Sequence, residues 1–223
     1  MEARLTGISR RETLKYLGYA GSPLPEDVLE QLSAGEREIL QRAAPRVLWR
    51  LFDRGPDGEL AGTGYTPAGD DIRDLLRGCD QVILMAATLG METEALLRRT
   101  QASDMARAVI LDAAASAAIE NVCDNLCADL AEAFAPRCLT DRFSQGYGDM
   151  PVSQQAELFR LLDISRRIGI SLSESGLMVP QKSVTALIGV SDRPQGRRSR
   201  GCEACAMSAD CAYRKGGTSC GKT

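Results

Sequence analysis

Short apolar runs mark the strands that the chain is expected to form. The clearest run, VILMAA at 82–87, is apolar at every position and lies between Asp80 and Gly90. A continuous apolar run of this length is typical of a strand that is buried on both faces of a sheet. The other predicted strands lie at 47–52, 171–173 and 183–190, with a weaker one at 59–65 after a turn at 54–58.

Helices are predicted where apolar residues recur every three or four positions. A capping box that begins at Ser9 starts the first helix, at 9–17. The pair Ser103-Asp104 can cap a long, alanine-rich helix at 105–134, and Pro136 prevents that helix from continuing. The remaining predicted helices lie at 25–43, interrupted at 33–35, and at 68–77, 91–99 and 152–168.

These elements indicate an α+β fold in which helices surround a small sheet. The sequence contains no internal repeat. Its length of 223 residues suits one domain of ordinary size with an appendage. We therefore expect a folded domain at 1–191, followed at 192–223 by a basic linker and an irregular, cysteine-rich tail.

The composition argues against several classes of function. A net charge of −3 and a pI near 5.2 give no basic field that would attract nucleic acid. No apolar run approaches the length of a membrane span, and the charged opening MEARLTGISRRE is unlike a secretory signal, so a cytoplasmic location is expected. Histidine is absent, which removes the commonest general base and metal ligand. Any metal site must therefore use cysteine or carboxylate.

The stretch TDRFSQGYGDMPVSQQ at 140–155 is the best candidate for a ligand loop. It connects a long helix to an amphipathic one, and loops held between regular elements commonly carry binding residues. An arginine there can grip a carboxylate with two hydrogen bonds, and a tyrosine can stack on a flat ring. On spacing alone, an ordinary connection with a surface arginine stays the alternative. The distinctive residues of the stretch are Arg142, Ser144, Gly146, Tyr147, Gly148, Asp149 and Pro151.

Two blocks of this sequence occur in a characteristic order. The first is Arg142-x-Ser144-x-Gly146-Tyr147-x-x-x-Pro151, and the second is Glu174-Ser175-x-x-Met178-x-Pro180-x-x-Ser183-Val184. Together they resemble the activation domain of cobalamin-dependent methionine synthase, and ISRRETLKYLGY and MAATLG are similar to a shorter, stand-alone form of that domain. A turn and the start of a core strand explain most of the second block. The resemblance extends from about 8 to 190 and implies a twisted, mainly antiparallel sheet flanked by helices.

The resemblance implies that the chain binds S-adenosylmethionine and supports the reductive methylation of cob(II)alamin on a partner. That partner would be a cobalamin-binding methionine synthase or a related corrinoid protein. One electron, from a donor such as a flavodoxin or a ferredoxin, and the methyl group of S-adenosylmethionine would regenerate methylcobalamin. Because reduced cobalt is the nucleophile, the polypeptide has only to position and polarise the reactants.

The same resemblance implies a set of residues that contact S-adenosylmethionine: Glu120, Arg142, Ser144, Gly146 and Tyr147. Arg142 would bind the carboxylate of the methionine moiety, and backbone groups at the serine and first glycine of the loop would approach the ligand. Tyr147 would lie near the reacting methyl group and is the candidate catalytic residue. Glu120 would hold the amino group or stabilise the sulfonium, with Asp124, one turn further along the same helix face, as the alternative acid.

The eight cysteines fall into two groups. The first group lies in apolar or helical surroundings and is expected to contribute small core residues: Cys79, Cys123, Cys127 and Cys138. The second group crowds the glycine-rich tail with the spacing C-x2-C-x5-C-x8-C: Cys202, Cys205, Cys211 and Cys220. Since no secretory signal is recognised, a disulfide framework is not expected.

Four thiolates in the short tail can hold zinc or an iron–sulfur cluster in a tetrahedral site. The spacing selects neither metal, and a disordered, thiol-bearing tail is the alternative. The electron that the implied reaction requires favours a cluster or a redox-active thiol pair. We expect Cys202, Cys205 and Cys211 to be ligands, and Cys220 to be the fourth.

Two other classes of function stay open at this stage. One is a binding module, either a corrinoid-protein partner or an S-adenosylmethionine sensor, that does not catalyse turnover. The other is a metal-binding structural protein whose tail is the main site. Binding of S-adenosylmethionine would exclude the structural protein. Methyl transfer to a reduced corrinoid would then distinguish the reactivation function from the binding module.

Overall fold

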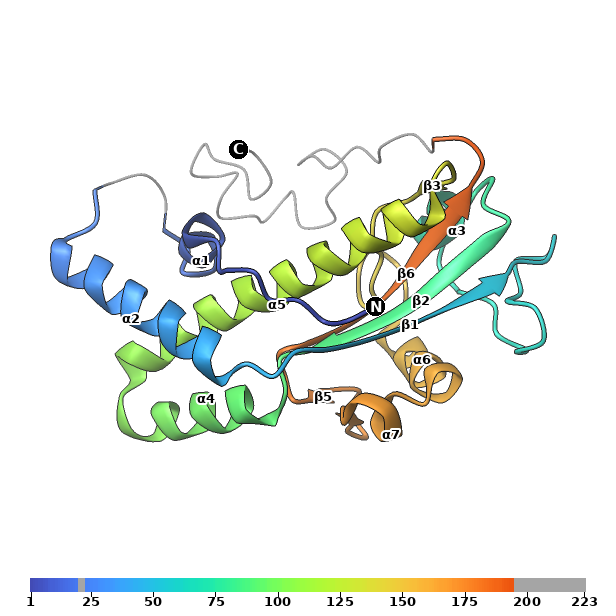
Figure 1. Ribbon diagram of the computed structural model, residues 1–223. Coiled ribbons are helices and arrows are strands. Elements are labelled where there is room, and N and C mark those ends of the chain that lie inside the picture. Colours follow the sequence, from blue (N-terminus) through green and yellow to red (C-terminus); the bar gives the residue numbers. More distant parts are fainter. Residues whose placement is uncertain (20–22, 195–223) are drawn as a thin grey trace.

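The computed structural model describes residues 1–19 and 23–194 (Figure 1). The helices are α1 (Arg10–Tyr16), α2 (Glu26–Arg42), α3 (Asp70–Leu75), α4 (Met91–Ser103), α5 (Met105–Phe134), η1 (Val152–Gln154), α6 (Gln155–Leu162) and α7 (Ile164–Ile168). The strands are β1 (Arg46–Asp53), β2 (Gln81–Thr88), β3 (Cys138–Leu139), β4 (Ser171–Leu172), β5 (Met178–Val179) and β6 (Ser183–Ser191).

The main sheet has four strands in the order β1-β2-β6-β3, and every neighbouring pair is antiparallel. The register places Leu84 of β2 between Arg50 of β1 and Leu187 of β6. Strands β4 and β5 form a separate two-stranded sheet. The prediction of an α+β fold with an antiparallel sheet flanked by helices is therefore confirmed.

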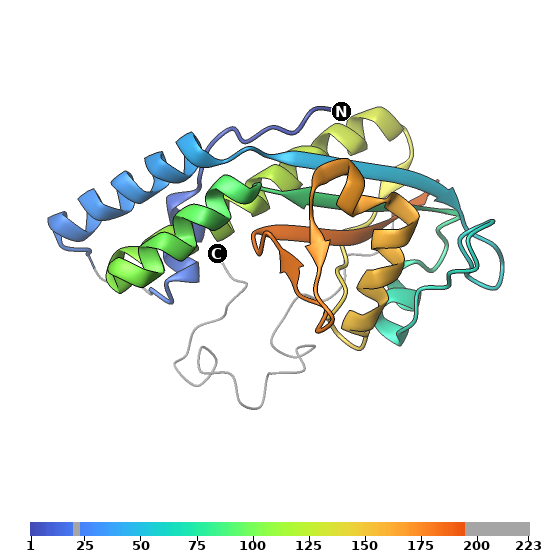
Figure 2. The ribbon, with the colours of Figure 1, turned by 90° about the horizontal axis from the view of Figure 1, so that it is seen from below.

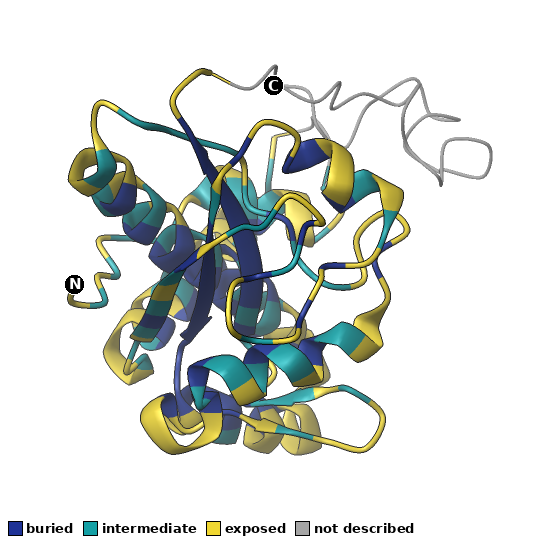
Figure 3. Cartoon of the chain, turned by 90° about the vertical axis from the view of Figure 1, so that its right-hand side faces the viewer, coloured by how far each residue is buried: buried dark blue, intermediate teal, exposed yellow. Residues whose placement is uncertain are grey.

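Strand β2 is buried on both faces, as its continuous apolar run predicts. Ile83 and Met85 belong to the core between the sheet and α5, whereas Val82 and Leu84 belong to the core between the sheet and α6 and α7. Figure 2 shows α6 and α7 on one side of the strands, and Figure 3 shows the strands in the middle of the sheet in the buried colour. Each face needs its own apolar set because successive side chains of a strand point in opposite directions.

Helix α5 has the predicted bounds, and α2 packs along it without a break. The carboxylate of Asp104 accepts a hydrogen bond from the backbone N–H of Arg107 at 3.0 Å and caps the start of α5. The interruption predicted at 33–35 is wrong, because Gly35 serves close packing between helices instead. A Cβ atom at that position would come within 3.0 Å of Ile110 Cγ2.

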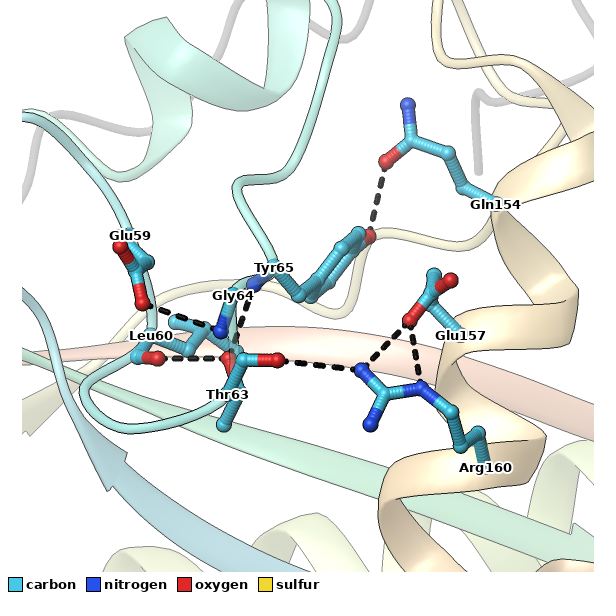
Figure 4. A network of polar contacts seen from close by, with 8 residues as sticks. All are labelled: Glu59, Leu60, Thr63, Gly64, Tyr65, Gln154, Glu157 and Arg160. Atoms are coloured by element: carbon cyan, nitrogen blue, oxygen red, sulfur yellow. Dashed lines mark hydrogen bonds and ion pairs between the residues drawn. The ribbon is translucent and has the colours of Figure 1, made fainter.

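The segment predicted as a strand at 59–65 is a loop with isolated bridges. Its groups bond to one another and to the α6 region, as Figure 4 shows. Thr63 Oγ1 donates to the carbonyl of Leu60 at 2.6 Å, and Tyr65 Oη donates to Gln154 Oε1 at 2.8 Å. Arg160 Nη2 donates to the carbonyl of Thr63 at 3.2 Å. The carbonyls of Leu60 and Thr63, which a strand could direct to a neighbouring strand, thus accept from side chains here.

Two predicted helices are also shorter or divided. The helix expected at 68–77 is limited to α3. The helix expected at 152–168 is divided into η1, α6 and α7, and the break between α6 and α7 lies at Asp163, which adopts a left-handed conformation with φ 54°. Among the described residues, no helix has both the length and the apolar character needed to cross a membrane.

Candidate functional site

The first half of the candidate loop extends the edge of the sheet. After β3, the backbone N–H of Thr140 donates to the carbonyl of Gly189 at 2.9 Å, and Phe143 exchanges two hydrogen bonds with Leu187 at 2.9 and 2.8 Å. Neighbouring residues of an extended segment point to opposite faces. Phe143 is therefore buried in the core beneath the sheet, and Arg142 extends to α5 on the other face.

Arg142 joins the loop to α5 through two ion pairs. Its Nη2 lies 2.7 Å from Glu120 Oε2, and its Nη1 lies 2.7 Å from Asp124 Oδ1. Nη1 also contacts Cys127 Sγ at 3.8 Å. The spacing of four residues between the two acids brings both carboxylates to one guanidinium, as the shared helix face predicts.

The environment of Arg142 keeps its positive charge. Burial lowers the pKa of Arg142, but the neighbouring groups outweigh burial and raise it overall; they are the thiols of Cys123 and Cys127 and the carboxylates of Glu120 and Asp124. Burial also raises the pKa of Cys123 to about 12, so that thiol is neutral at physiological pH. The two carboxylates therefore supply the negative charge that stabilises the guanidinium.

The second half of the loop is a tight turn that presents Tyr147. The backbone N–H of Tyr147 donates to the carbonyl of Ser144 at 3.2 Å, and that of Gly146 donates to the carbonyl of Met150 at 3.0 Å. Gly146 has φ +86°, in the region that favours glycine. Tyr147 is 64% exposed, and its ring lies edge-on to Phe143, with ring centroids 6.4 Å apart. The two glycines that flank Tyr147 therefore allow the sharp turn, since Gly148 also has a positive φ, of 54°.

Asp149, for which the sequence offered no role, fastens the loop to α3. Its carboxylate accepts hydrogen bonds from the backbone N–H groups of Asp70 at 2.6 Å and Asp71 at 3.0 Å. These two hydrogen bonds are the main reason why the pKa of Asp149 is lowered. Sequence reasoning could not find this partnership because the residues that Asp149 caps lie 79 and 78 positions away.

Tyr16, at the end of α1, is a further residue of the site that sequence reasoning missed. Burial, followed by the negative charge of Glu120, raises the pKa of Tyr16 to about 12, and Tyr147 and Arg142 also act on it. Its ring also lines a cavity of about 190 Å³ between α1, α4 and α5. The available signal was its place in ISRRETLKYLGY, four positions after Glu12.

The site therefore combines a held cation, two carboxylates and an exposed phenol. The residues predicted from the first block, together with Glu120, come together at the junction of the loop and α5. The second block is mainly structural, since Ser183 opens β6 and donates to Thr88 Oγ1 at 2.8 Å. A larger cavity of about 380 Å³ is lined by Arg54, by residues of α3 and by residues just after it, but by none of the loop residues.

The described cysteines are core residues or lie at the edge of the core. Cys79 and Cys123 are buried, and Cys127 and Cys138 are half-buried. Over 1–19 and 23–194, no group of three or more cysteine, aspartate or glutamate side chains is arranged to hold a metal ion. The predicted metal ligands Cys202, Cys205, Cys211 and Cys220 lie outside the described residues.

Comparison with known proteins places this geometry in a family. No curated protein matches the chain. The crystal structure of the MetH reactivation domain bound to AdoHcy has a similar fold, with a TM-score of 0.57 and 16% sequence identity over 94% of this chain and 83% of that one. The family model for the vitamin B12 dependent methionine synthase activation domain matches residues 70–196, which include the loop, Glu120 and the second block. The chain belongs to the vitamin B12 dependent methionine synthase activation domain family.

Proposed function

We propose that the chain binds S-adenosylmethionine and supports the reductive methylation of cob(II)alamin on a partner, a cobalamin-binding methionine synthase or a related corrinoid protein. The observation that carries the proposal is the guanidinium of Arg142, held at the loop by Glu120 and Asp124 at 2.7 Å each. The similarity in fold to a domain bound to AdoHcy supports the same class of ligand. We also propose that the chain is divided into a domain at 1–191 and a tail at 192–223.

The site residues suit the chemical groups of S-adenosylmethionine. In this proposal Arg142 binds the carboxylate of the methionine moiety, because a guanidinium matches a carboxylate with two parallel hydrogen bonds. Glu120 receives the ammonium group. The backbone at Ser144 and Gly146 approaches the ligand, and the exposed ring of Tyr147 lies beside the sulfonium, where an aromatic face attracts positive charge.

The proposed reaction is a one-electron reduction followed by a methyl transfer. An external donor, such as a flavodoxin or a ferredoxin, reduces the partner's cob(II)alamin to cob(I)alamin. The cobalt lone pair then forms the bond to the methyl carbon while the carbon–sulfur bond breaks toward sulfur, which leaves methylcobalamin and neutral S-adenosylhomocysteine. The polypeptide supplies no electron pair to this step, so its contribution is to position the sulfonium.

The first test is ligand binding. Calorimetric titration of the full-length protein with S-adenosylhomocysteine should give a saturable heat, and S-adenosylmethionine should compete for the same site. If the chain were instead a corrinoid-protein partner that binds no S-adenosylmethionine, neither compound would give heat. That outcome would overturn the proposal.

The second test is turnover. The protein is mixed anaerobically with a candidate cobalamin protein in the cob(II)alamin state, a low-potential reductant and methyl-labelled S-adenosylmethionine. Label should appear on the corrinoid only when both proteins and the reductant are present. Binding without label transfer to any corrinoid partner would favour the sensor or binding module instead.

A further inference from the structure

Both terminal nitrogens of Arg142 are engaged by the chain's own acids. Nη2 donates to Glu120 Oε2 and Nη1 donates to Asp124 Oδ1, each at 2.7 Å. The two nitrogens form one edge of the guanidinium, and a bidentate carboxylate needs such an edge. A ligand carboxylate that takes this edge must therefore share it with Glu120 and Asp124 or replace one of them.

The two acids differ in how firmly they are held. The side chain of Glu120 is 36% exposed, whereas that of Asp124 is 70% exposed. An exposed ion pair contributes little to stability because water and dissolved ions screen it. Asp124 is therefore the acid that leaves the guanidinium at the lower cost, and Glu120 is the one that stays.

We propose that Asp124 is an internal competitor that holds Nη1 of Arg142 until the carboxylate of the ligand replaces it. The inference rests on the proposed function, since it assumes that Arg142 receives a carboxylate ligand. It assigns opposite roles to two acids on one helix face. Removal of the charge at Asp124 should strengthen ligand binding, whereas removal of the charge at Glu120 should weaken it.

The exchange gives the site selectivity for an α-amino-acid end. The ligand's carboxylate replaces Asp124 at the guanidinium, and its neighbouring ammonium group lies within reach of Glu120. A nucleoside that lacks the amino-acid end brings no carboxylate to the exchange. Its affinity should therefore be independent of the charge at Asp124.

The experiment compares two ligands in three full-length proteins: wild type, Asp124→Asn and Glu120→Gln. Titration with S-adenosylhomocysteine should give an affinity about two- to five-fold higher in Asp124→Asn, the scale of a released exposed ion pair. Glu120→Gln should bind it more weakly than wild type. 5′-Methylthioadenosine, which lacks the amino-acid end, should bind wild type and Asp124→Asn equally.

Asp129→Asn is the matched control, because Asp129 lies on the same helix and pairs with Arg4 instead. It should leave both affinities unchanged, and melting curves should show that every variant is folded. The proposed competition is wrong if Asp124→Asn binds S-adenosylhomocysteine no more tightly than wild type does. It is also wrong if 5′-methylthioadenosine gains affinity in the same variant. Either outcome leaves the proposed function intact. If S-adenosylhomocysteine binds neither wild type nor Asp124→Asn, the proposed function is wrong and the competition with it.

Discussion

The carboxylate of Asp149 accepts a hydrogen bond from the backbone N–H of Asp70 at 2.6 Å, across 79 positions of sequence. The first turn of a helix has backbone donors without partners inside the helix, and a side-chain oxygen is their usual acceptor. Here the acceptor comes from the ligand loop, so one carboxylate both starts α3 and fixes the end of the turn that presents Tyr147.

Asp149→Ala should lower the melting temperature and loosen the loop together with α3. Because the backbone hydrogen bonds lower the folded-state pKa of Asp149, its contribution to stability is present above its unfolded pKa, about 3.9, and is lost as pH falls through the folded pKa. The difference in melting temperature between wild type and variant should be larger at pH 7 than at pH 3. Glu174→Gln, which removes an exposed carboxylate in a turn, is the control. It should leave the melting temperature unchanged at both pH values.

Arg142→Ala should weaken binding of S-adenosylhomocysteine by about 1.5–3 kcal/mol, the scale of a lost charge-assisted contact. Arg142→Lys should recover only part of the loss, because an ammonium cannot reproduce the planar, two-pronged grip. Calorimetry measures both. Arg166→Ala, which removes an exposed arginine paired with Asp163 on the other side of the sheet, is the control. Equal affinity in wild type and Arg142→Ala would exclude Arg142 from the ligand site.

The elements that sequence predicted well are those whose signal is local. The burial of β2 follows from its own apolar run, and the start of α5 follows from the pair Ser103-Asp104, of which Asp104 is the cap. The segment 59–65 was misjudged because the partner of Tyr65 is Gln154, far along the chain. Strands β3 and β5 each have two residues, too few to display an alternation.

The candidate site follows the same division. Arg142 could be proposed because it belongs to the first block, and Glu120 because it resembles an acidic residue of the family; the structure brings the two together. Tyr16 was missed although it lies in ISRRETLKYLGY, because that segment alone does not indicate which helix face it will meet. Asp149 belongs to the motif, but its role depends on α3, which only the folded chain brings near it.

Gly189→Ala should destabilise the domain by roughly 1–3 kcal/mol, the usual cost of extra volume in a packed core. A Cβ atom there would lie 2.6 Å from Cys79 Sγ and 2.9 Å from Leu76 Cδ2. Urea denaturation followed by circular dichroism measures the change. Gly7→Ala is the matched control, because a Cβ atom at Gly7 meets nothing within 4 Å. Equal midpoints for the two variants would contradict the close packing of the segment after α3 against β6.

Protein purified without air should carry a metal bound by Cys202, Cys205, Cys211 and Cys220. The basis is the clustering of thiols in a tail with few apolar residues, in a chain that has no histidine. Elemental analysis and visible absorbance distinguish iron, which would support electron transfer, from zinc, which would support a structural or docking role. The double variant Cys202→Ser/Cys205→Ser should lose the metal and keep its affinity for S-adenosylhomocysteine. Absence of both metals from anaerobic wild type would leave the tail with free thiols.

Gly146→Val should disrupt ligand binding more than Ser144→Ala. Valine is β-branched and strongly disfavours a positive φ, and Gly146 has φ +86°. Its Cβ atom would also lie 3.0 Å from Val152 Cγ2, so that side chain or the turn must shift. Ser144→Ala keeps the backbone carbonyl that accepts from Tyr147, so the turn should persist.

Gly62→Val tests whether the loss of ligand binding in Gly146→Val comes from backbone strain in general or from the position of that turn. Gly62 has φ +73° and open space around it, so its substitution is strained in the same way but lies in the loop at 59–65. Both valine variants should lose stability, by roughly 1–2 kcal/mol for the left-handed backbone alone. Only Gly146→Val should also lower the affinity for S-adenosylhomocysteine, because only that turn presents Tyr147 and follows Arg142. A Gly146→Val protein that binds as tightly as Gly62→Val would show that the turn does not shape the ligand site.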